Sequence, residues 1–460
     1  MVFFPMRQFK GRSLPKNQKK SNNNTLLAAY PEQSDKSGYG ASHSYFFCKK
    51  RRDYQMENHP SLHKNISLAK KYAFIQYFGI TSLWLLYLSS FKGMTLVQIG
   101  FLESIFHITS FVFEVPSGAL ADRFGYKKIL LFGKVMAIIS SIGMIYGQSF
   151  SHFAVAFAFS ALSYNFNSGT YEALIFESMK GLDEESGYLD KLAHINFLIE
   201  ISAQSGVILA GILADTYFQA VYMVNIVLCL LNMLLIYRMV EPIKRLAPQS
   251  DETVGLSKKV GQSYTRILVN AWQLLKQHKE LRGWILFFAL LDSFAATYYF
   301  YFQNYLSVLG YNGKATSFYL FAAALFGIFG AKFSPSIEQK LRKNRIPYVF
   351  PVVVLLSLLL SALGNQLLIF VGFVLSIIFS AVSPTIASAY INQLIPSEER
   401  ATLLSANSMA YSLCMIILFP VIGGVIDLLD FRIAYLTMGL SIMVVGGTFA
   451  VVVKKQFYRK

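Results

Sequence analysis

Apolar stretches of about 20 residues with few charges recur from Tyr72 to the end of the chain, and each is long enough to cross a bilayer as a helix. A helix suits such a segment because backbone surrounded by lipid must satisfy its own hydrogen bonds. Hydrophobic residues make up 54% of the chain and charged residues 15%, which is atypical of a soluble globule. The sequence therefore predicts an all-α membrane protein with twelve transmembrane helices, at Tyr72 to Phe91, Leu96 to Leu120, Ile129 to Gln148, His152 to Phe176, Leu189 to Ala214, Ala220 to Met239, Trp284 to Leu309, Ala315 to Ile337, Tyr348 to Leu363, Leu367 to Tyr390, Thr402 to Ile426 and Ile433 to Val453.

The basic residues are distributed unevenly between the two sides of this expected membrane. Cytoplasmic loops accumulate Lys and Arg, and if both termini are cytoplasmic the outward loops hold only Lys92, Lys314 and Arg432. The inward segments then carry Arg123, Lys127, Lys128, Lys244, Arg245, Lys258, Lys259, Arg266, Lys340, Arg342, Lys343, Arg345, Lys454, Lys455, Arg459 and Lys460. We therefore expect both termini in the cytoplasm, and the net charge of +17 follows from this topology and does not indicate nucleic-acid binding.

Composition also divides the chain along its length. Residues 1–70 are rich in Lys, Asn, Ser and Tyr and have no sustained periodicity, so we expect a basic, disordered cytoplasmic extension. A start of translation at Met56 is an open alternative. The other predicted parts are an N-terminal six-helix bundle at 71–240, a cytoplasmic linker at 241–282, a C-terminal six-helix bundle at 283–453 and a cytoplasmic tail at 454–460.

The two predicted bundles share short sequence matches. The five residues from Phe159 match those from Phe379 at an offset of 220, in the fourth and tenth spans. The next spans each end in a Gly-x-x-x-Asp pattern, Gly211 with Asp215 and Gly423 with Asp427. This spacing predicts two parallel, pseudo-repeated halves related by an axis along the membrane normal, with substrate bound between them near the middle of the bilayer.

Ten residues between the second and third spans, from Gly118 to Lys127, read Gly-Ala-Leu-Ala-Asp-Arg-Phe-Gly-Tyr-Lys. They resemble the cytoplasmic loop signature of the major facilitator superfamily, Gly-x-x-x-Asp-Arg-x-Gly-Arg-[Arg/Lys]. Tyr126 departs from the signature by standing where Arg is usual. The resemblance implies a secondary transporter in which this loop closes an inner gate, through Gly118, Asp122, Arg123, Gly125 and Lys127.

The same resemblance implies a contact for each of these residues. Gly118 would let the second helix pass close to the eleventh. Asp122 would face the positive N-terminal end of that helix, near residues 400–404, where an anion is stabilised by the helix dipole. Arg123 would pair with Glu172 or Glu177 at the inner end of the fourth span. An ordinary basic turn, the alternative, accounts for Lys127 but not for Gly118, Asp122 and Gly125.

Ionisable side chains within the predicted spans are candidate functional groups, because a charge inside a bilayer is costly. The second span places Glu103, His107, Ser110 and Glu114 on one helical face. Glu103 and His107 are candidates for proton coupling, or they satisfy each other through an i to i+4 hydrogen bond. At similar depth on adjacent helices, Glu114 and Lys134 are expected to form a structural ion pair. Glu200 and Asp292 are two further candidates for proton or substrate binding. For each of them the alternative is an ordinary interhelical hydrogen bond.

A set of aromatic and amide side chains completes the predicted cavity. Such groups line pockets for partly apolar ligands, although each alone is also typical of helix packing. They are Gln76, Trp84 and Tyr87 in the first span, Tyr164 and Asn165 in the fourth, Tyr298, Tyr299 and Gln303 in the seventh, and Asn407 and Tyr411 in the eleventh.

These residues favour a proton-coupled transporter that works by alternating access in a bacterial cytoplasmic membrane. Intramembrane acids beside aromatics suit lipophilic cations, and the chain resembles drug-efflux members of the superfamily, so export of an amphipathic or cationic compound is the favoured function. Proton-coupled uptake of a nutrient or metabolite, or a transporter-like sensor, is the alternative. We expect a monomer whose partners are a small-molecule substrate, protons and lipid, with no nucleic acid, metal or cofactor and no enzymatic activity.

Overall fold

A computed structural model of the chain describes residues 62–242 except 183, 185 and 186, residues 273 and 276–394, and residues 400–457. All secondary structure within these ranges is helical. Most of the predicted extension and linker lies outside the described residues. Residues 62–76, however, form a helix, so the expected disordered extension does not reach residue 70. Asn65 holds this helix in place by donating to Ser178 Oγ (3.0 Å) and to the Val240 carbonyl oxygen (2.8 Å).

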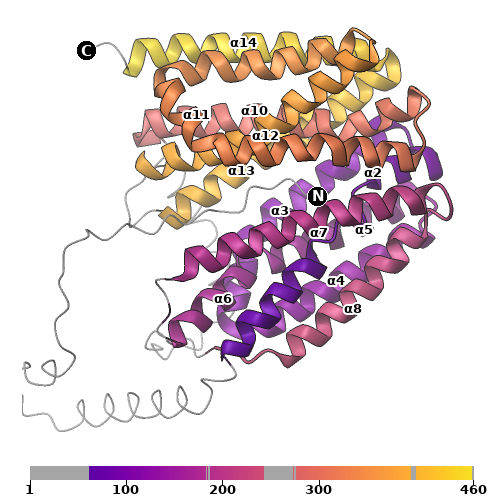
Figure 1. The fold of residues 1–460 in the computed structure, drawn as a ribbon, viewed down its shortest axis with the longest axis vertical. Helices are drawn as coiled ribbons and strands as arrows, with labels where there is room; N and C mark the ends of the chain where they lie inside the picture. Colours follow the sequence, from indigo (N-terminus) through magenta and orange to yellow (C-terminus); the bar gives the residue numbers. More distant parts are fainter. Residues whose placement is uncertain are drawn as a thin grey trace, which may run out of the picture.

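The helices form two bundles that lie side by side, with the N-terminal elements in one and the C-terminal elements in the other (Figure 1). The largest contacts between them are α3 with α13 and α7 with α11, and α2 also contacts α10. The N-terminal bundle contains residues 62–76, α2 (Trp84–Leu86), the π-helix η1 (Tyr87–Phe91), α3 (Leu96–Phe124), α4 (Tyr126–Tyr146), α5 (Phe150–Asn167), α6 (Thr170–Gly181), α7 (Tyr188–Ala214) and α8 (Ala220–Arg238). The C-terminal bundle contains α10 (Lys279–Val308), α11 (Gly313–Ala362), α12 (Gln366–Leu394), α13 (Arg400–Leu428) and α14 (Phe431–Phe457).

Ten helical stretches of the described residues are long and apolar enough to cross a membrane. Two of them belong to α11, whose 50 residues would measure about 75 Å if straight, more than twice the thickness of a bilayer core. The ribbon of α11 turns back between its two apolar halves (Figure 1). The loop predicted between the eighth and ninth spans is therefore helical.

The first predicted span is interrupted near its middle. Residues 77–83 are not helical, and they separate the helix 62–76 from α2 and η1. Ser202 Oγ of α7 donates to the carbonyl oxygen of Phe74 and so satisfies one acceptor in the last turn before the break. Hydropathy predicted one continuous helix here because the break carries mostly apolar side chains.

The fourth predicted span is also divided. Its first part, α5, ends at Asn167, and α6 begins at Thr170 after Gly169, whose φ of 78° is compatible with glycine but strained for other residues. Glu172 Oε2 accepts a hydrogen bond from the Gly169 amide (2.9 Å), which caps the new helix. The helices therefore do not form twelve continuous spans, although each predicted span has a helical counterpart.

Small residues allow the closest helix contacts, as is usual within membranes. The interrupted segment crosses α7 where Gly79 meets Gly206, and a Cβ added to Gly206 would overlap the backbone of Gly79. In the interface between the bundles, a Cβ on Gly100 would lie 2.8 Å from the Pro420 nitrogen. These positions therefore admit no side chain without a shift of backbone.

The crossing of Gly79 and Gly206 can be tested with a single methyl group. Gly206→Ala should lower the apparent melting temperature of the purified protein, because overpacking costs about 1–3 kcal/mol. Gly447→Ala is the matched control, since a Cβ on this helical glycine of α14 would meet no described atom within 4 Å. Equal melting temperatures for the two variants would contradict the proposed close crossing.

Candidate functional site

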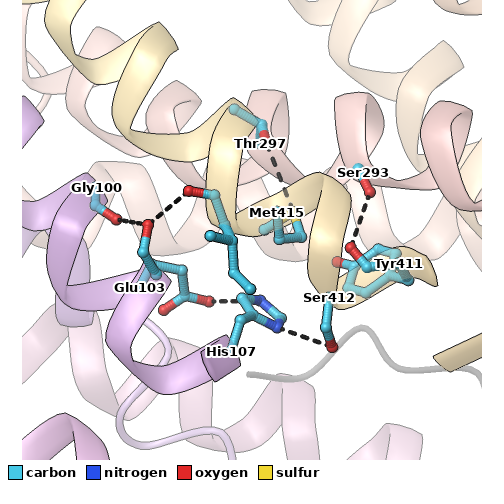
Figure 2. Close-up of polar contacts among 10 residues, drawn as sticks. Gly100, Glu103, His107, Ser293, Thr297, Tyr411, Ser412 and Met415 are labelled. Atoms are coloured by element: carbon cyan, nitrogen blue, oxygen red, sulfur yellow. Dashed lines mark hydrogen bonds and ion pairs between the residues drawn. The ribbon is translucent and has the colours of Figure 1, made fainter. Parts of the chain in front are cut away.

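Glu103 and His107 of α3 form a buried ion-pair contact in the interface between the two bundles. His107 Nε2 lies 3.5 Å from Glu103 Oε1, and its Nδ1 lies 3.4 Å from Ser412 Oγ of α13 (Figure 2). The other carboxylate oxygen, Oε2, is buried and has no hydrogen-bond partner among the described residues. The i to i+4 contact is therefore formed, and one acceptor remains for a proton or a ligand.

Tyr411 connects this pair to the acid of the other bundle. The Tyr411 and His107 rings are in edge contact, with centroids 5.8 Å apart. Ser293 Oγ of α10, next to Asp292 in the chain, donates to the Tyr411 carbonyl oxygen (3.5 Å). Asp292 of α10 accepts a hydrogen bond from Ser383 Oγ of α12 (2.7 Å). The tertiary structure thus brings two predicted acids, one from each half, to a common tyrosine.

The predicted polar stripe of α3 continues from this cluster toward its other end. Ser110 donates to Asn165 Oδ1 and accepts, through its carbonyl oxygen, from Asn165 Nδ2, both at 2.8 Å. Tyr164, next to Asn165 on α5, is within electrostatic range of Tyr411. Tyr164 and Asn165, two of the predicted cavity residues, therefore lie beside α3, and Asn165 is engaged in a structural bond.

The remaining predicted site residues lie on both bundles. Glu200 is exposed on α7 and within electrostatic range of Tyr299 in the opposite bundle. Trp84 is enclosed by the rings of Phe157, Phe300 and Phe419. Polar side-chain atoms that are buried without a hydrogen-bond partner in the described residues occur on Trp84 (Nε1), Gln303 (both amide atoms) and Asn407 (Oδ1).

The predicted ion pair between Glu114 and Lys134 is wrong. Lys134 is 1% exposed, and its ammonium donates to Gln76 Oε1 and lies 5.0 Å from the centre of the Tyr72 ring. α4 packs mainly on α5 and α8, so this side chain turns away from α3. Gln76 consequently faces the interior of the N-terminal bundle.

The signature loop is organised by an acid that the sequence did not single out. Gly125 turns the chain with a φ of 93°, and the carboxylate of Glu241 accepts from the amides of Tyr126 (2.6 Å) and Lys127 (2.9 Å). Lys127 Nζ donates to the Tyr237 carbonyl oxygen (3.2 Å). Glu241 therefore caps α4 and ties the loop to the end of α8. Its position as the acid directly after the sixth span was the available signal.

Within the described part of the chain, the contacts expected of Gly118 and Arg123 are not formed, and the one expected of Asp122 involves side chains outside the described residues. A Cβ on Gly118 would meet no described atom within 4 Å, so this structure shows no close helix approach there. Arg123 is exposed beside the Phe124 ring and forms no ion pair with Glu172 or Glu177 in the described part of the chain. Asp122 is also exposed, and the side chains at 400–404 that it was expected to face lie outside the described residues.

The repeated Gly-x-x-x-Asp pattern forms two matching contacts between the bundles. Asp215, after α7, accepts from the amides of Gly313 (2.6 Å) and Lys314 (2.9 Å) at the start of α11. Asp427 of α13 accepts from Leu96 (3.0 Å) and Val97 (2.7 Å) at the start of α3. We call these two contacts the aspartate clamps. Each places a carboxylate at the positive end of a helix in the opposite bundle.

Glycines bring the helices of each clamp together. A Cβ on Gly211 would lie 2.5 Å from the Gly313 carbonyl oxygen, and one on Gly423 would lie 2.5 Å from that of Leu96. At their other ends the two bundles diverge (Figure 1). The bundles are therefore joined at the predicted outer side. Among the described residues, no group of three His, Cys, Asp or Glu side chains could hold a metal ion.

Comparison with known proteins agrees with this architecture. A family model described as Major Facilitator Superfamily matches residues 72–368. The chain is 27% identical over 381 residues to the "Uncharacterized MFS-type transporter YxaM" of Bacillus subtilis (strain 168), covering 80% of this chain and 88% of that protein. The solved nucleoside transporter NupG has a TM-score of 0.72 at 14% identity over 85% of this chain and 99% of its own. The POT family transporter PepTSo has a TM-score of 0.65 at 12% identity over 87% and 99%. The two structural likenesses show the fold alone.

The Glu103 and His107 contact can be measured with a double-mutant cycle. His107→Ala leaves the Glu103 carboxylate buried without its ion-pair partner and should destabilise the protein more than Glu103→Gln does. The double variant should recover part of this loss, giving a coupling free energy of about 0.5–3 kcal/mol. Denaturant unfolding of the purified protein measures the cycle, and additive effects would show that the two side chains do not interact.

Proposed function

The chain belongs to the major facilitator superfamily of membrane transporters, and on this premise we propose that it is a proton-coupled exporter of a small amphipathic or cationic compound. The observation that carries the proposal is the cluster of Glu103, His107, Asp292 and Tyr411 in the interface between the bundles. Acids from both halves approach one tyrosine there. Such a site changes shape whenever the halves move relative to each other.

The chemistry of the cluster suits a cation. A buried carboxylate is stabilised either by a proton or by a positively charged ligand, so binding of one disfavours binding of the other. Aromatic rings such as that of Tyr411 add cation–π attraction and apolar contact. Competition of this kind between proton and substrate is what proton-driven export of a cation requires.

The aspartate clamps supply the alternating-access part of the proposal. They close the predicted outer side through hydrogen bonds from four backbone amides to the two carboxylates, and through two glycine contacts. These interactions are short-ranged and lie at one end of the helices, so a tilt of one bundle breaks them together. The present structure then corresponds to a state closed toward the outside.

Proton-coupled uptake of a nutrient or metabolite is the second candidate. It is favoured by the sequence of α5, which contains no arginine, whereas many drug and proton antiporters carry one within the fourth span. A sensor that binds ligand without moving it would have the same cluster. Measurement of flux separates these three activities.

The proposed export can be tested with ethidium in a host stripped of its own pumps. Expression should lower ethidium accumulation, and a protonophore should abolish the difference. Glu103→Gln and Asp292→Asn should reduce export at least about tenfold, since each removes a group proposed to exchange a proton for the substrate. Asp122→Asn should impair transport without preventing membrane insertion, and Glu200→Gln tests the exposed acid.

Two outcomes would redirect the proposal. If ethidium accumulation equals that of the vector control while the protein is shown to be in the membrane, uptake or a narrower substrate range replaces export of ethidium-like compounds as the proposed function. A metabolite screen follows in that case. If all four acid variants export normally, the site assignment is wrong even though the protein is an exporter.

The clamps can be tested by measuring the outer opening directly. Spin labels at Tyr217 and Leu429, exposed residues near the clamp ends of the two bundles, report their separation after the native cysteines are replaced. Asp215→Asn and Asp427→Asn should each shift the distance distribution to longer values, because the neutral amide is a weaker partner of the helix dipole.

Asp430→Asn is the matched control. Asp430 accepts from the Ile433 amide (2.7 Å) and caps α14 within the C-terminal bundle, so its loss should leave the distance between the bundles unchanged. Unchanged distributions in both clamp variants would show that the clamps do not hold the outer side closed.

A further inference from the structure

Lys134 places a cation inside the N-terminal bundle, away from the acid cluster described above. It is 1% exposed and lies eight residues into α4, about 12 Å along the helix from Tyr126. Its ammonium donates to Gln76 Oε1 and lies 5.0 Å from the centre of the Tyr72 ring. Gln76 and Tyr72 belong to the last turns of the helix 62–76, directly before the interruption of the first span.

Neutral groups surround this ammonium. It forms no ion pair with a carboxylate of the described residues. The titratable side chains near it are Tyr72 of the first helix, whose ring faces the ammonium, and Cys229 of α8. Asn232 of α8 approaches Gln76 Oε1 through Nδ2 (3.5 Å), and its own Oδ1 is buried without a partner. The charge is therefore balanced only by an amide oxygen, a ring face and the negative end of a helix dipole.

The interruption next to Lys134 separates two parts of the first span that have different neighbours. The inner part is fixed to the N-terminal bundle, since Tyr171 donates to the Ala69 carbonyl oxygen (2.8 Å). The outer part contacts both bundles: Tyr87 donates to the Met144 carbonyl oxygen (3.0 Å) in its own half, while Ser89 bonds to Asn304 and Trp84 packs on Phe300 in the opposite half. Residues 77–83 therefore link a segment held by one half to a segment that bridges the two halves.

We propose that Lys134 is a second proton-binding group of the transport cycle and that its charge fixes the end of the inner part of the first span. This inference rests on the proposed function in assuming a transport cycle. Loss of the proton removes the attraction to the helix end and to the Tyr72 ring and so weakens the hold on Gln76, while the Tyr72 hydroxyl keeps its own hydrogen bond to Asn167. Movement of the inner part is then coupled, through residues 77–83, to Trp84 between the bundles.

The test uses purified protein without substrate, so that its result does not depend on export. Trp272→Phe and Trp284→Phe leave Trp84 as the only tryptophan. Trp84 emission should then show one step between about pH 6 and 10, the range in which a buried lysine exchanges its proton. Lys134→Met should abolish this step. Gln76→Glu should abolish it as well, because a carboxylate beside Lys134 holds the proton throughout that range.

Controls identify the group that titrates. Cys229→Ser and Tyr72→Phe remove the two neighbouring titratable groups and should keep the step, as should Glu103→Gln in the separate acid cluster. A flat profile in the starting protein, or a step that survives in Lys134→Met, would overturn the inference. If Lys134→Met does not fold, a step that survives in Gln76→Glu would likewise overturn the inference. An intact step in a protein that fails to export ethidium would refute the proposed function alone.

Discussion

The absence of water from the bilayer core is the constraint on which the rest of this structure depends, because every helix end and charge there must find a partner within the protein. At the ends of the bundles, three carboxylates that connect separate elements accept hydrogen bonds from helix N-termini. Asp215 and Asp427 cap helices of the opposite bundle, and Glu241 caps α4 at the signature loop. The hydrogen bonds that cap these helices therefore also hold separate elements together.

This arrangement also explains how a stable protein can contain a movable interface. Each aspartate clamp pairs a carboxylate with a glycine contact, Gly211 with Gly313 and Gly423 with Leu96. Both parts act over short distances and at one end of the bundles. The interior of each bundle keeps its own contacts, such as those of Lys134 and Tyr171, when such an end opens.

The sequence was a good guide to properties of single helices and a poor guide to their breaks and partners. Hydropathy located the spans, and helical periodicity correctly placed Glu103 beside His107. It missed the interruption at residues 77–83, because that segment is as apolar as a helix and is shaped by its crossing with Gly206 of α7. The similar depth of Glu114 and Lys134 along their helices predicted an ion pair, whereas Lys134 faces the first helix and α8.

The sequence by itself determined an all-helical membrane protein with related halves, a glycine-containing loop after the second span and a repeated Gly-x-x-x-Asp pattern. Only the tertiary structure decided that Asp215 and Asp427 bond across the halves, that Glu241 caps α4, and that Tyr411 contacts both His107 and the residue next to Asp292. The reason is physical. Hydropathy and periodicity are local properties of one helix, but the partner of a side chain depends on how each helix is rotated and crossed, which the packing of both bundles sets together.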